Sequence, residues 1–150
     1  MFRLNRLTDY AVVVMTQMAQ SRDEVRTAPQ IARDTGVPLP TVSKLLNALA
    51  RDGLIESQRG ASGGYALTRG AKDITVAEVI QALEGPIALT ACVDHSSEHC
   101  DVESLCPMRG NWNKVNEAIR SALGGVTLAD MSPAFAFDPV RSDNTAQPVG

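Results

Sequence analysis

The sequence predicts a mainly α-helical fold that carries a small β-hairpin, and three observations support this prediction. Apolar residues recur at helical spacing in most stretches before residue 131. The pairs Thr27/Gln30 and Thr75/Glu78 have the spacing of a capping box, in which two side chains satisfy the free N–H groups of a helix start. The glycine-rich segment 57–64 separates two short apolar runs, as the tip of a hairpin does. At 150 residues, the chain has about the length of one domain.

Two helices are predicted before residue 37. Between residues 8 and 20 the residues Val12, Met15 and Ala19 recur at helical spacing, and either Asn5 or Thr8 can cap the start. The second helix begins at the Thr27/Gln30 capping box and ends at Gly36, because glycine readily takes the left-handed conformation that terminates a helix.

A third helix is expected from Pro40 to Asp52, because proline fits the first turn of a helix. Its apolar residues share one face and are Val42, Leu45, Leu46 and Leu49. The outward residues are small, polar or basic and are Thr41, Ser43, Lys44 and Asn47. Two short helices joined by a glycine turn indicate a helix-turn-helix, for which an ordinary helical hairpin is the alternative.

A hairpin follows directly, with short β-like segments at 53–55 and 65–67. A helix-turn-helix followed by such a hairpin is typical of a winged-helix DNA-binding domain, although an unspecialised surface hairpin is the alternative. We expect this domain to span residues 1–85. The predicted DNA contacts are Thr41, Ser43 and Lys44 in the major groove, Arg59 and Gly60 at the wing, and Arg69 on the DNA backbone.

Two further helices are predicted beyond the hairpin. The helix 75–85 should complete the core of the winged domain, and a longer one should start at Pro107 and end at Gly124. The longer helix has a broad apolar face made of Met108, Trp112, Val115, Ala118, Ile119, Ala122 and Leu123. We interpret the region 107–131 as a homodimer contact, with packing on its own domain as the alternative. One more helical turn is expected at 127–131, and residues 132–150 are expected to form a mobile tail.

The charge of the chain is divided unevenly. Residues 1–70 carry 9 Lys and Arg against 6 Asp and Glu, a net charge of +3, whereas residues 71–150 carry 5 against 11, a net charge of −6. A basic first half fits a domain that faces DNA phosphates. The apolar run 11–15 is too short to span a bilayer, and an odd number of cysteines favours a reducing compartment, so no membrane association and a cytoplasmic location are expected.

The chain's three cysteines, Cys92, Cys100 and Cys106, lie in one polar loop within residues 86–106. Thiolates are soft ligands, so an iron–sulfur cluster, a zinc ion and redox-active thiols all fit this spacing, and inert loop cysteines are a further alternative. If Pro107 begins a helix, the helix dipole would favour a thiolate at Cys106. An enzyme with a cysteine nucleophile assisted by His95 or His99 is disfavoured, because the sequence offers no residue to orient the pair.

Three segments resemble the Rrf2 family of winged-helix transcription regulators, which includes the iron–sulfur regulators IscR and NsrR. These segments are RLNRLTDYAVVVMTQMA, LPTVSKLLNALARDGLIESQRGASGGYAL and the stretch from GPIALTACVDH to LCPMRGNWNKVNEAI. The match is closest to the branch that regulates SUF-type iron–sulfur cluster assembly. The resemblance implies a homodimer with a long dimerisation helix and a cluster held by Cys92, Cys100 and Cys106, with [2Fe-2S] favoured and [4Fe-4S] possible.

The resemblance leaves the fourth cluster ligand open. The histidine that the IscR-like pattern has three residues after the last cysteine is replaced here by Arg109, which cannot ligate a metal. The NsrR-like pattern uses an aspartate that reaches across from the other subunit, and Leu7-Thr8-Asp9 matches it. Asp9 is therefore the expected fourth ligand, although it could instead complement the dipole at a helix start. The alternatives are His95, His99 and Asn111.

These observations together predict a non-enzymatic, homodimeric transcription regulator that binds a pseudo-palindromic operator in double-stranded DNA. Cluster occupancy would switch its operator affinity, and the expected role is repression of SUF-type cluster assembly genes. The alternative is a winged-helix regulator whose three-cysteine loop binds zinc or senses thiol oxidation or nitric oxide.

Overall fold

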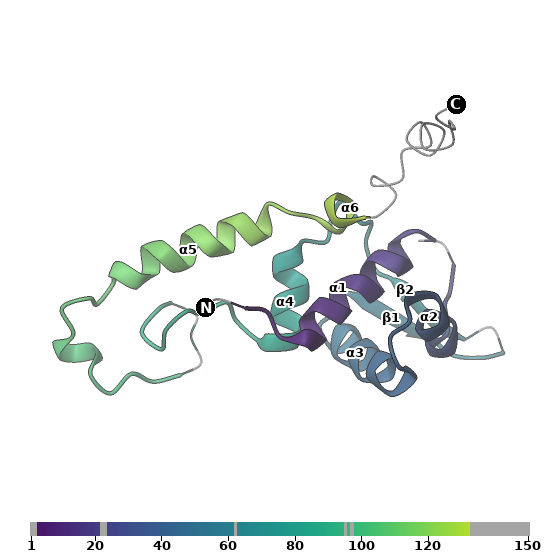
Figure 1. The fold of residues 1–150 in the computed structure, drawn as a ribbon, viewed down its shortest axis with the longest axis horizontal. Coiled ribbons are helices and arrows are strands. Elements are labelled where there is room, and N and C mark those ends of the chain that lie inside the picture. Colours follow the sequence, from purple (N-terminus) through teal and green to yellow (C-terminus); the bar gives the residue numbers. More distant parts are fainter. Residues whose placement is uncertain (1–2, 22–23, 62, 95, 97, 133–150) are drawn as a thin grey trace, which may run out of the picture.

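The computed structural model describes residues 3–21, 24–61, 63–94, 96 and 98–132. Six α-helices, one short 3₁₀ helix and one two-stranded antiparallel sheet follow one another in this part of the chain (Figure 1). Their bounds are α1 Arg6–Ala19, α2 Ala28–Thr35, α3 Leu39–Arg51, β1 Ile55–Gln58, β2 Gly64–Leu67, α4 Val76–Glu84, η1 Glu103–Leu105, α5 Asn111–Gly124 and α6 Leu128–Met131. This mainly helical fold with a small β-hairpin confirms the predicted fold class.

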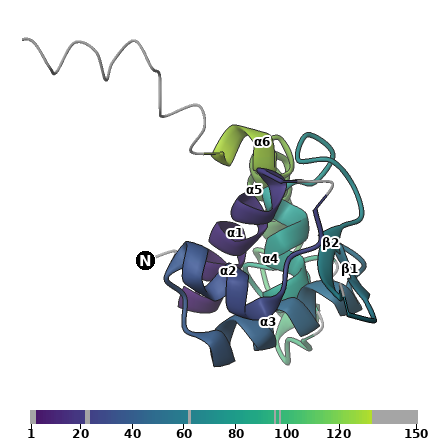
Figure 2. The same ribbon diagram turned by 90° about the vertical axis from the view of Figure 1, so that its right-hand side faces the viewer.

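A single hydrophobic core joins α1, α2, α3 and α4 to the base of the hairpin. The predicted apolar face of α3 is fully buried in it, and so are Met15 of α1, Ile31 of α2 and Val79 of α4. Figure 2 shows this compact body end-on, with α2 on one side, the β1–β2 hairpin on the other and α3 below between them. The apolar periodicity of the sequence therefore identified the core-facing sides of these helices correctly.

Local chemistry explains most helix boundaries. Both predicted capping boxes are present, with Thr27 paired to Gln30 at α2 and Thr75 paired to Glu78 at α4. Gly36 ends α2 with a φ of 77°, and of the two predicted caps it is Asn5 that accepts a hydrogen bond at the start of α1. The third helix begins at Leu39, one residue earlier than expected.

A third chain segment pairs with the two-stranded wing. Strands β1 and β2 pair antiparallel with Ile55 opposite Leu67 and Gln58 opposite Gly64. Arg26, in the connection before α2, exchanges two backbone hydrogen bonds with Tyr65, of 2.9 Å and 2.7 Å. This pairing attaches the wing to the chain segment that leads into the helix-turn-helix.

The prediction that a helix starts at Pro107 is wrong. Residues 107–110 form turns, and α5 begins only at Asn111, because Gly110 adopts a left-handed φ of 80° at the N-cap position and no side chain caps the helix there. Cys106 is consequently not placed at a helix start, and the dipole argument for a thiolate at this position does not apply.

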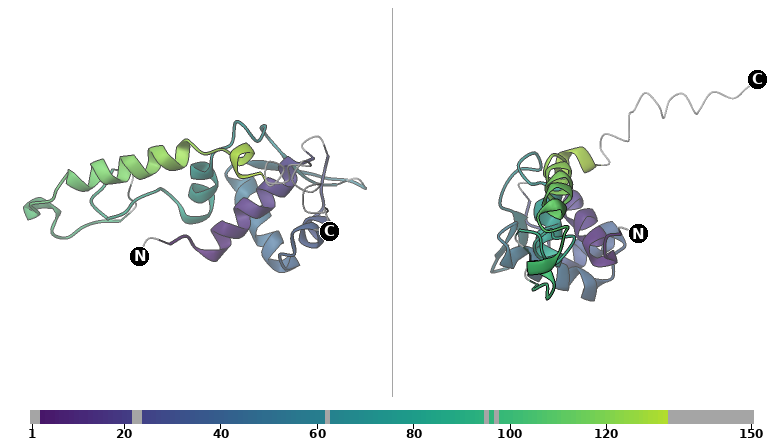
Figure 3. Two further views of the ribbon diagram at one scale, coloured as in Figure 1. Left: turned by 45° about the horizontal axis from the view of Figure 1, so that its top comes forward. Right: turned by 90° about the vertical axis from the view of Figure 1, so that its left-hand side faces the viewer.

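The helix α5 extends away from the compact body together with the loop before it (Figures 1 and 3). A small second cluster fastens it, in which Ile119 and Leu123 pack against Val76, Ile80 and Ile87. The chain then returns to the body, where Leu128 of α6 is fully buried in the main core. No helix among the described residues has the length and apolar character needed to cross a bilayer. The expected tail, 132–150, lies outside the described residues apart from Ser132.

Candidate DNA interface and cysteine loop

The outer face of α3 presents the residues predicted to read DNA. Lys44 is exposed, while Thr41 and Ser43 are half-buried beside it near the start of the helix. The opposite face of α3 is locked into the core by Leu45 and Leu49, both fully buried. The buried face therefore fixes which side of α3 points outward, as a recognition helix requires.

The tip of the wing presents a second positive group. Arg59 and Gly60 are both exposed, and Gly60 adopts a left-handed φ of 115° and accepts a hydrogen bond of 2.9 Å from the Gly63 amide. Neither Lys44 nor Arg59 takes part in any ion pair that the described residues form. Both cations are free to approach phosphate or the negative potential of a groove.

Arg69 has partners within the protein. Its guanidinium donates to Oε1 of Glu78 at 2.6 Å and to the backbone carbonyl of Asp73 at 2.7 Å. Burial by itself raises the pKa of Glu78. The hydrogen bond from the Thr75 amide and the nearby Arg69 guanidinium lower the pKa by more than burial raises it, so the pKa of Glu78 lies below its ordinary value. Arg69 thus holds the end of the wing to the start of α4, and any contact with the DNA backbone would add to this structural role.

All three cysteines are free thiols, and none of them is buried in a core. The hydroxyl of Thr90 lies 3.2 Å from Sγ of Cys92, and Cys106 directly follows η1. Among the described residues, no three Cys, His, Asp or Glu side chains are close enough together to hold a metal ion. As a donor set, three accessible thiols in one loop fit a thiolate-ligated metal or cluster and leave one ligand position open.

The candidate fourth ligands lie in different places. Asp9 is exposed in the first turn of α1 and lines a groove of about 360 Å³ with Val13 and Asp34. His99 is exposed and lines a shallow cavity of about 240 Å³ next to Cys100. Asn111 is exposed at the start of α5, whereas His95 lies outside the described residues.

Arg109, which replaces the histidine of the IscR-like pattern, is also found at the cysteine loop. Its guanidinium Nε lies 3.9 Å from Oε1 of Glu103 in η1, and both residues line the shallow cavity beside His99. This ion pair joins the turn after Cys106 to the short helix before it. Arg109 therefore cannot ligate a metal, but it forms an ion pair within the loop.

Two asparagines that the sequence analysis missed connect the loop to α5. The side chain of Asn116 is buried and bonds to the backbone of Ile87 and Leu89, and Asn113 bonds to the amide of Asp94. The available signal was a polar residue inside an apolar stripe, because Asn116 lies four residues after Trp112 and three before Ile119 on one side of α5.

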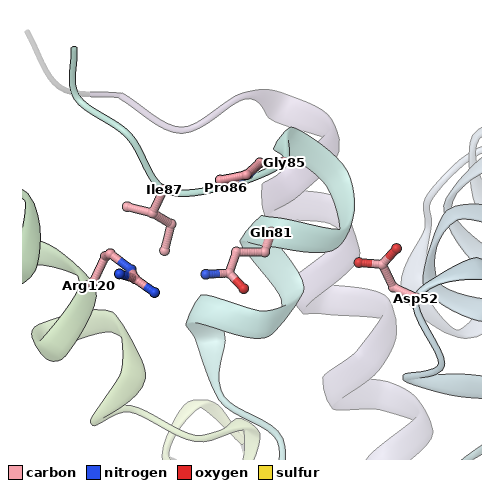
Figure 4. Close-up of a pocket in the computed structure, with 6 residues that line it drawn as sticks. All are labelled: Asp52, Gln81, Gly85, Pro86, Ile87 and Arg120. Atoms are coloured by element: carbon pink, nitrogen blue, oxygen red, sulfur yellow. The ribbon is translucent and has the colours of Figure 1, made fainter. Parts of the chain in front are cut away.

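A cavity of about 340 Å³ lies where the compact body meets α5. Its lining includes Asp52 at the end of α3, Gln81 of α4 and Arg120 of α5. Figure 4 shows the Gln81 side chain between Asp52 on one side and Arg120 on the other. The cavity therefore lies between the end of α3 and α5, beside α4.

The exposed face of α5 is apolar over much of its length. Trp112 is 41% exposed and Val115 is 44% exposed, and Met108 in the preceding turn is 48% exposed. Ile119 and Leu123, from the same predicted stripe, instead pack on the body. The outer half of the stripe thus has no cover from the part of the chain that the structure describes.

Comparisons with known proteins agree with this geometry. Residues 4–134 match the Rrf2 family, described as iron-dependent transcriptional regulators. Protein aau3 of Rhizobium meliloti (strain 1021) is 32% identical over 96% of this chain and 99% of its own length. The HTH-type transcriptional regulator IscR of Xenorhabdus nematophila is 33% identical over 86% of this chain and 78% of its own length.

Solved structures are similar as well. The global cysteine regulator CymR of B. subtilis superposes with a TM-score of 0.70 at 27% identity, covering 92% of this chain and all of that one. IscR of T. potens superposes with a TM-score of 0.64 at 28% identity, covering 99% of this chain and 94% of that one. The predicted resemblance is confirmed: the chain belongs to the Rrf2 family and is a winged-helix, DNA-binding transcriptional regulator, not an enzyme.

Proposed function

We propose that this regulator is a cytoplasmic homodimer that senses iron–sulfur cluster status and represses SUF-type cluster assembly genes. The observation that carries the proposal is the position of the cysteines. Every thiol of the chain lies in the one loop that connects the DNA-binding body to the exposed helix α5. A group bound there would act on both the operator-reading elements and the dimer contact.

The proposed ligands are Cys92, Cys100 and Cys106 of one protomer and Asp9 of the partner subunit. Thiolates are the usual protein ligands of iron–sulfur clusters, and a [2Fe-2S] cluster is the favoured form. Asp9 is exposed on the surface of α1 and forms no ion pair with the described residues, so its carboxylate is available to a second chain. Ligation across the dimer would tie α1 of one protomer to the loop of the other.

The dimer contact is proposed on the outer stripe of α5. An exposed run of large apolar side chains is costly in water, and a two-fold axis through this helix would cover Trp112 and Val115 of both copies. The region 107–131 then serves as the dimerisation region, residues 1–85 as the DNA-binding domain and 86–106 as the cluster loop.

Operator binding is proposed through both recognition helices of the dimer on a pseudo-palindromic site. Thr41, Ser43 and Lys44 would face base edges in the major groove, while Arg59 and Gly60 of the wing would contact the adjacent groove. Arg69 would contact the DNA backbone with the part of its guanidinium that remains exposed beside Glu78.

The DNA docking is tested with Lys44→Ala and a fluorescently labelled operator. We expect at least a several-fold loss of affinity and a smaller salt dependence, since one cationic contact with DNA is removed. Lys114→Ala on α5 removes the same charge far from α3 and serves as the matched control. Unchanged affinity of Lys44→Ala at every salt concentration would contradict the docking.

The cluster is tested by purifying the protein without oxygen and recording its visible absorption. We expect an absorption band from the cluster that disappears in Cys100→Ala. A colourless protein with one zinc ion per chain would disprove the cluster. Asp9→Ala tests the fourth ligand separately, because a wild-type spectrum and cluster lifetime in this variant would rule Asp9 out.

The second candidate is a thiol, zinc or nitric-oxide sensor on the same scaffold. It is favoured by the free state of all three cysteines and by the likeness to the crystal structure of the oxidised form of Staphylococcus aureus CymR, which has a TM-score of 0.63 at 26% identity. Metal analysis separates zinc from iron. Mass spectrometry after mild oxidant or nitric oxide treatment detects modified thiols directly.

A further inference from the structure

The first half of the cysteine loop is fastened to α5 by two asparagine side chains. The amide of Asn116 accepts a hydrogen bond of 2.9 Å from the Leu89 N–H and donates one of 2.9 Å to the Ile87 carbonyl. One turn earlier on α5, Oδ1 of Asn113 accepts a bond of 2.9 Å from the Asp94 N–H. Together the two side chains hold the backbone on both sides of Cys92.

The burial of Asn116 makes this contact specific. The residue is only 1% exposed, and a buried amide is tolerated only when its donor and acceptor are both satisfied. Here the two ends of the amide bind two different backbone groups of the loop. An aliphatic residue at this position would leave the Ile87 carbonyl and the Leu89 N–H without these partners, so these two hydrogen bonds depend on the asparagine side chain.

Apolar contacts reinforce the same segment. Ile87 is 8% exposed and Val93 is 5% exposed, so a buried side chain lies on each side of Cys92 in the sequence. The Thr90 hydroxyl lies 3.2 Å from Sγ of Cys92. Cys92 is thus part of a segment that is anchored by burial and by side-chain hydrogen bonds from a regular helix.

Residues 98–106, in the second half of the loop, form no comparable anchors with the other described residues. Val102 is 64% exposed and Leu105 is 90% exposed. The hydrogen bonds and the ion pair that residues 98–106 form with other described residues all stay within residues 96–109. Cys100 and Cys106 therefore belong to a segment that contacts mainly itself.

We propose that Asn113 and Asn116 are positioning residues that hold the backbone around Cys92 against α5. Cys100 and Cys106 then move toward Cys92 to complete the ligand set. This inference rests on the proposed cluster function and assigns different roles to its ligands. Because the fixed ligand is attached to α5, a change in the second half of the loop would be transmitted to the proposed dimer helix through these two side chains.

The clamp is tested in the full-length apoprotein with Asn116→Ala and Asn113→Ala. Amide hydrogen exchange of peptides covering 87–94 should become about tenfold faster in Asn116→Ala and less so in Asn113→Ala, because each change removes anchoring hydrogen bonds. Exchange over 98–106 should not change. Lys114→Ala, an exposed residue of the same helix, is the matched control. Unchanged exchange over 87–94 in both asparagine variants would overturn the inference.

Thiol alkylation provides a readout that needs no cluster. In the wild-type apoprotein, iodoacetamide should modify Cys92 more slowly than Cys100 and Cys106, and Asn116→Ala should remove this difference. Equal rates at the three cysteines of the wild type would contradict the clamp. Asn113 is only half-buried, so Asn113→Ala provides a folded variant if Asn116→Ala does not fold.

Cluster lifetime connects the clamp to the proposed function. In anaerobically purified protein, both asparagine variants should lose their visible absorption at least several-fold faster than wild type, while Lys114→Ala should not. Wild-type lifetimes in both variants would overturn the positioning role. A wild-type protein without any band would refute the cluster proposal instead, and the clamp would then be judged by exchange and alkylation alone.

Discussion

Substitution of Gly64 by alanine tests how the wing is attached to the DNA-binding body. A Cβ atom at this position would lie 2.6 Å from the Arg26 carbonyl oxygen and 2.9 Å from Cγ1 of Val25. Both distances are shorter than nonbonded carbon contacts allow, and the nearest atoms belong to the backbone. The segment containing Arg26 must therefore move away from β2.

The expected cost follows from the contacts that this movement breaks. The two backbone hydrogen bonds between Arg26 and Tyr65 contribute about 1 kcal/mol each. The ion pair of 3.1 Å between Arg26 and Asp34 of α2 contributes up to about 1 kcal/mol more. A loss of about 2–3 kcal/mol corresponds to a decrease in Tm of roughly 4–12 °C for a chain of 150 residues.

Thermal unfolding followed by circular dichroism measures the stability, and fluorescence anisotropy with a labelled operator measures the DNA affinity. Operator binding should weaken as well, because the displaced wing carries Arg59. Gly124→Ala is the matched control, since nothing lies within 4 Å of its added Cβ, and it should be neutral or stabilising by up to about 1 kcal/mol. A wild-type Tm and a wild-type affinity for Gly64→Ala would refute the attachment.

Three further changes test other parts of the molecule. Leu49→Ala should lower the free energy of unfolding by about 2–5 kcal/mol in urea titrations, because this side chain is fully buried. Asn47→Ala, at an exposed position of the same helix, is the control, and a smaller loss of stability in Leu49→Ala than in Asn47→Ala would contradict the burial of Leu49. The pKa of Glu78 is below its ordinary value in the folded state, so its stabilising effect is present above the ordinary pKa and is lost as the pH falls through the lowered one. Glu78→Gln should therefore lose less stability on acidification than wild type, and parallel stability–pH curves would be inconsistent with this assignment. Trp112→Ala should weaken self-association in sedimentation experiments, and an unchanged association constant would argue against the dimer contact on α5.

Sequence patterns were reliable where the physical cause is local. The capping box of Thr27 and Gln30 depends on two side chains three residues apart, and the apolar face of α3 depends on a repeat within one helix. Both could be predicted because no distant part of the chain is needed to form them. The error at Pro107 has a local cause too, since proline permits a helix start but the left-handed Gly110 three residues later prevents the helix from beginning there.

Contacts between distant segments could not be predicted in this way. Arg26 pairs with Tyr65 although 38 residues separate them (27–64), and Asn116 bonds to Ile87 and Leu89 across 29 and 27 positions. Leu128 is buried in the main core although the chain leaves the body at Gly85 and returns only after α5. Each contact depends on how the helices pack, and hydrophobic periodicity does not specify which surfaces meet.

The sequence by itself determined the helical and hairpin elements, the family and the gathering of all three thiols in one loop. These follow from local hydrogen bonding, apolar spacing and residue identity. Only the tertiary structure decided which part of that loop is held. The packing of α5 on α4 brings Asn113 and Asn116 to the backbone around Cys92 and gives Cys100 and Cys106 no equivalent anchor among the described residues.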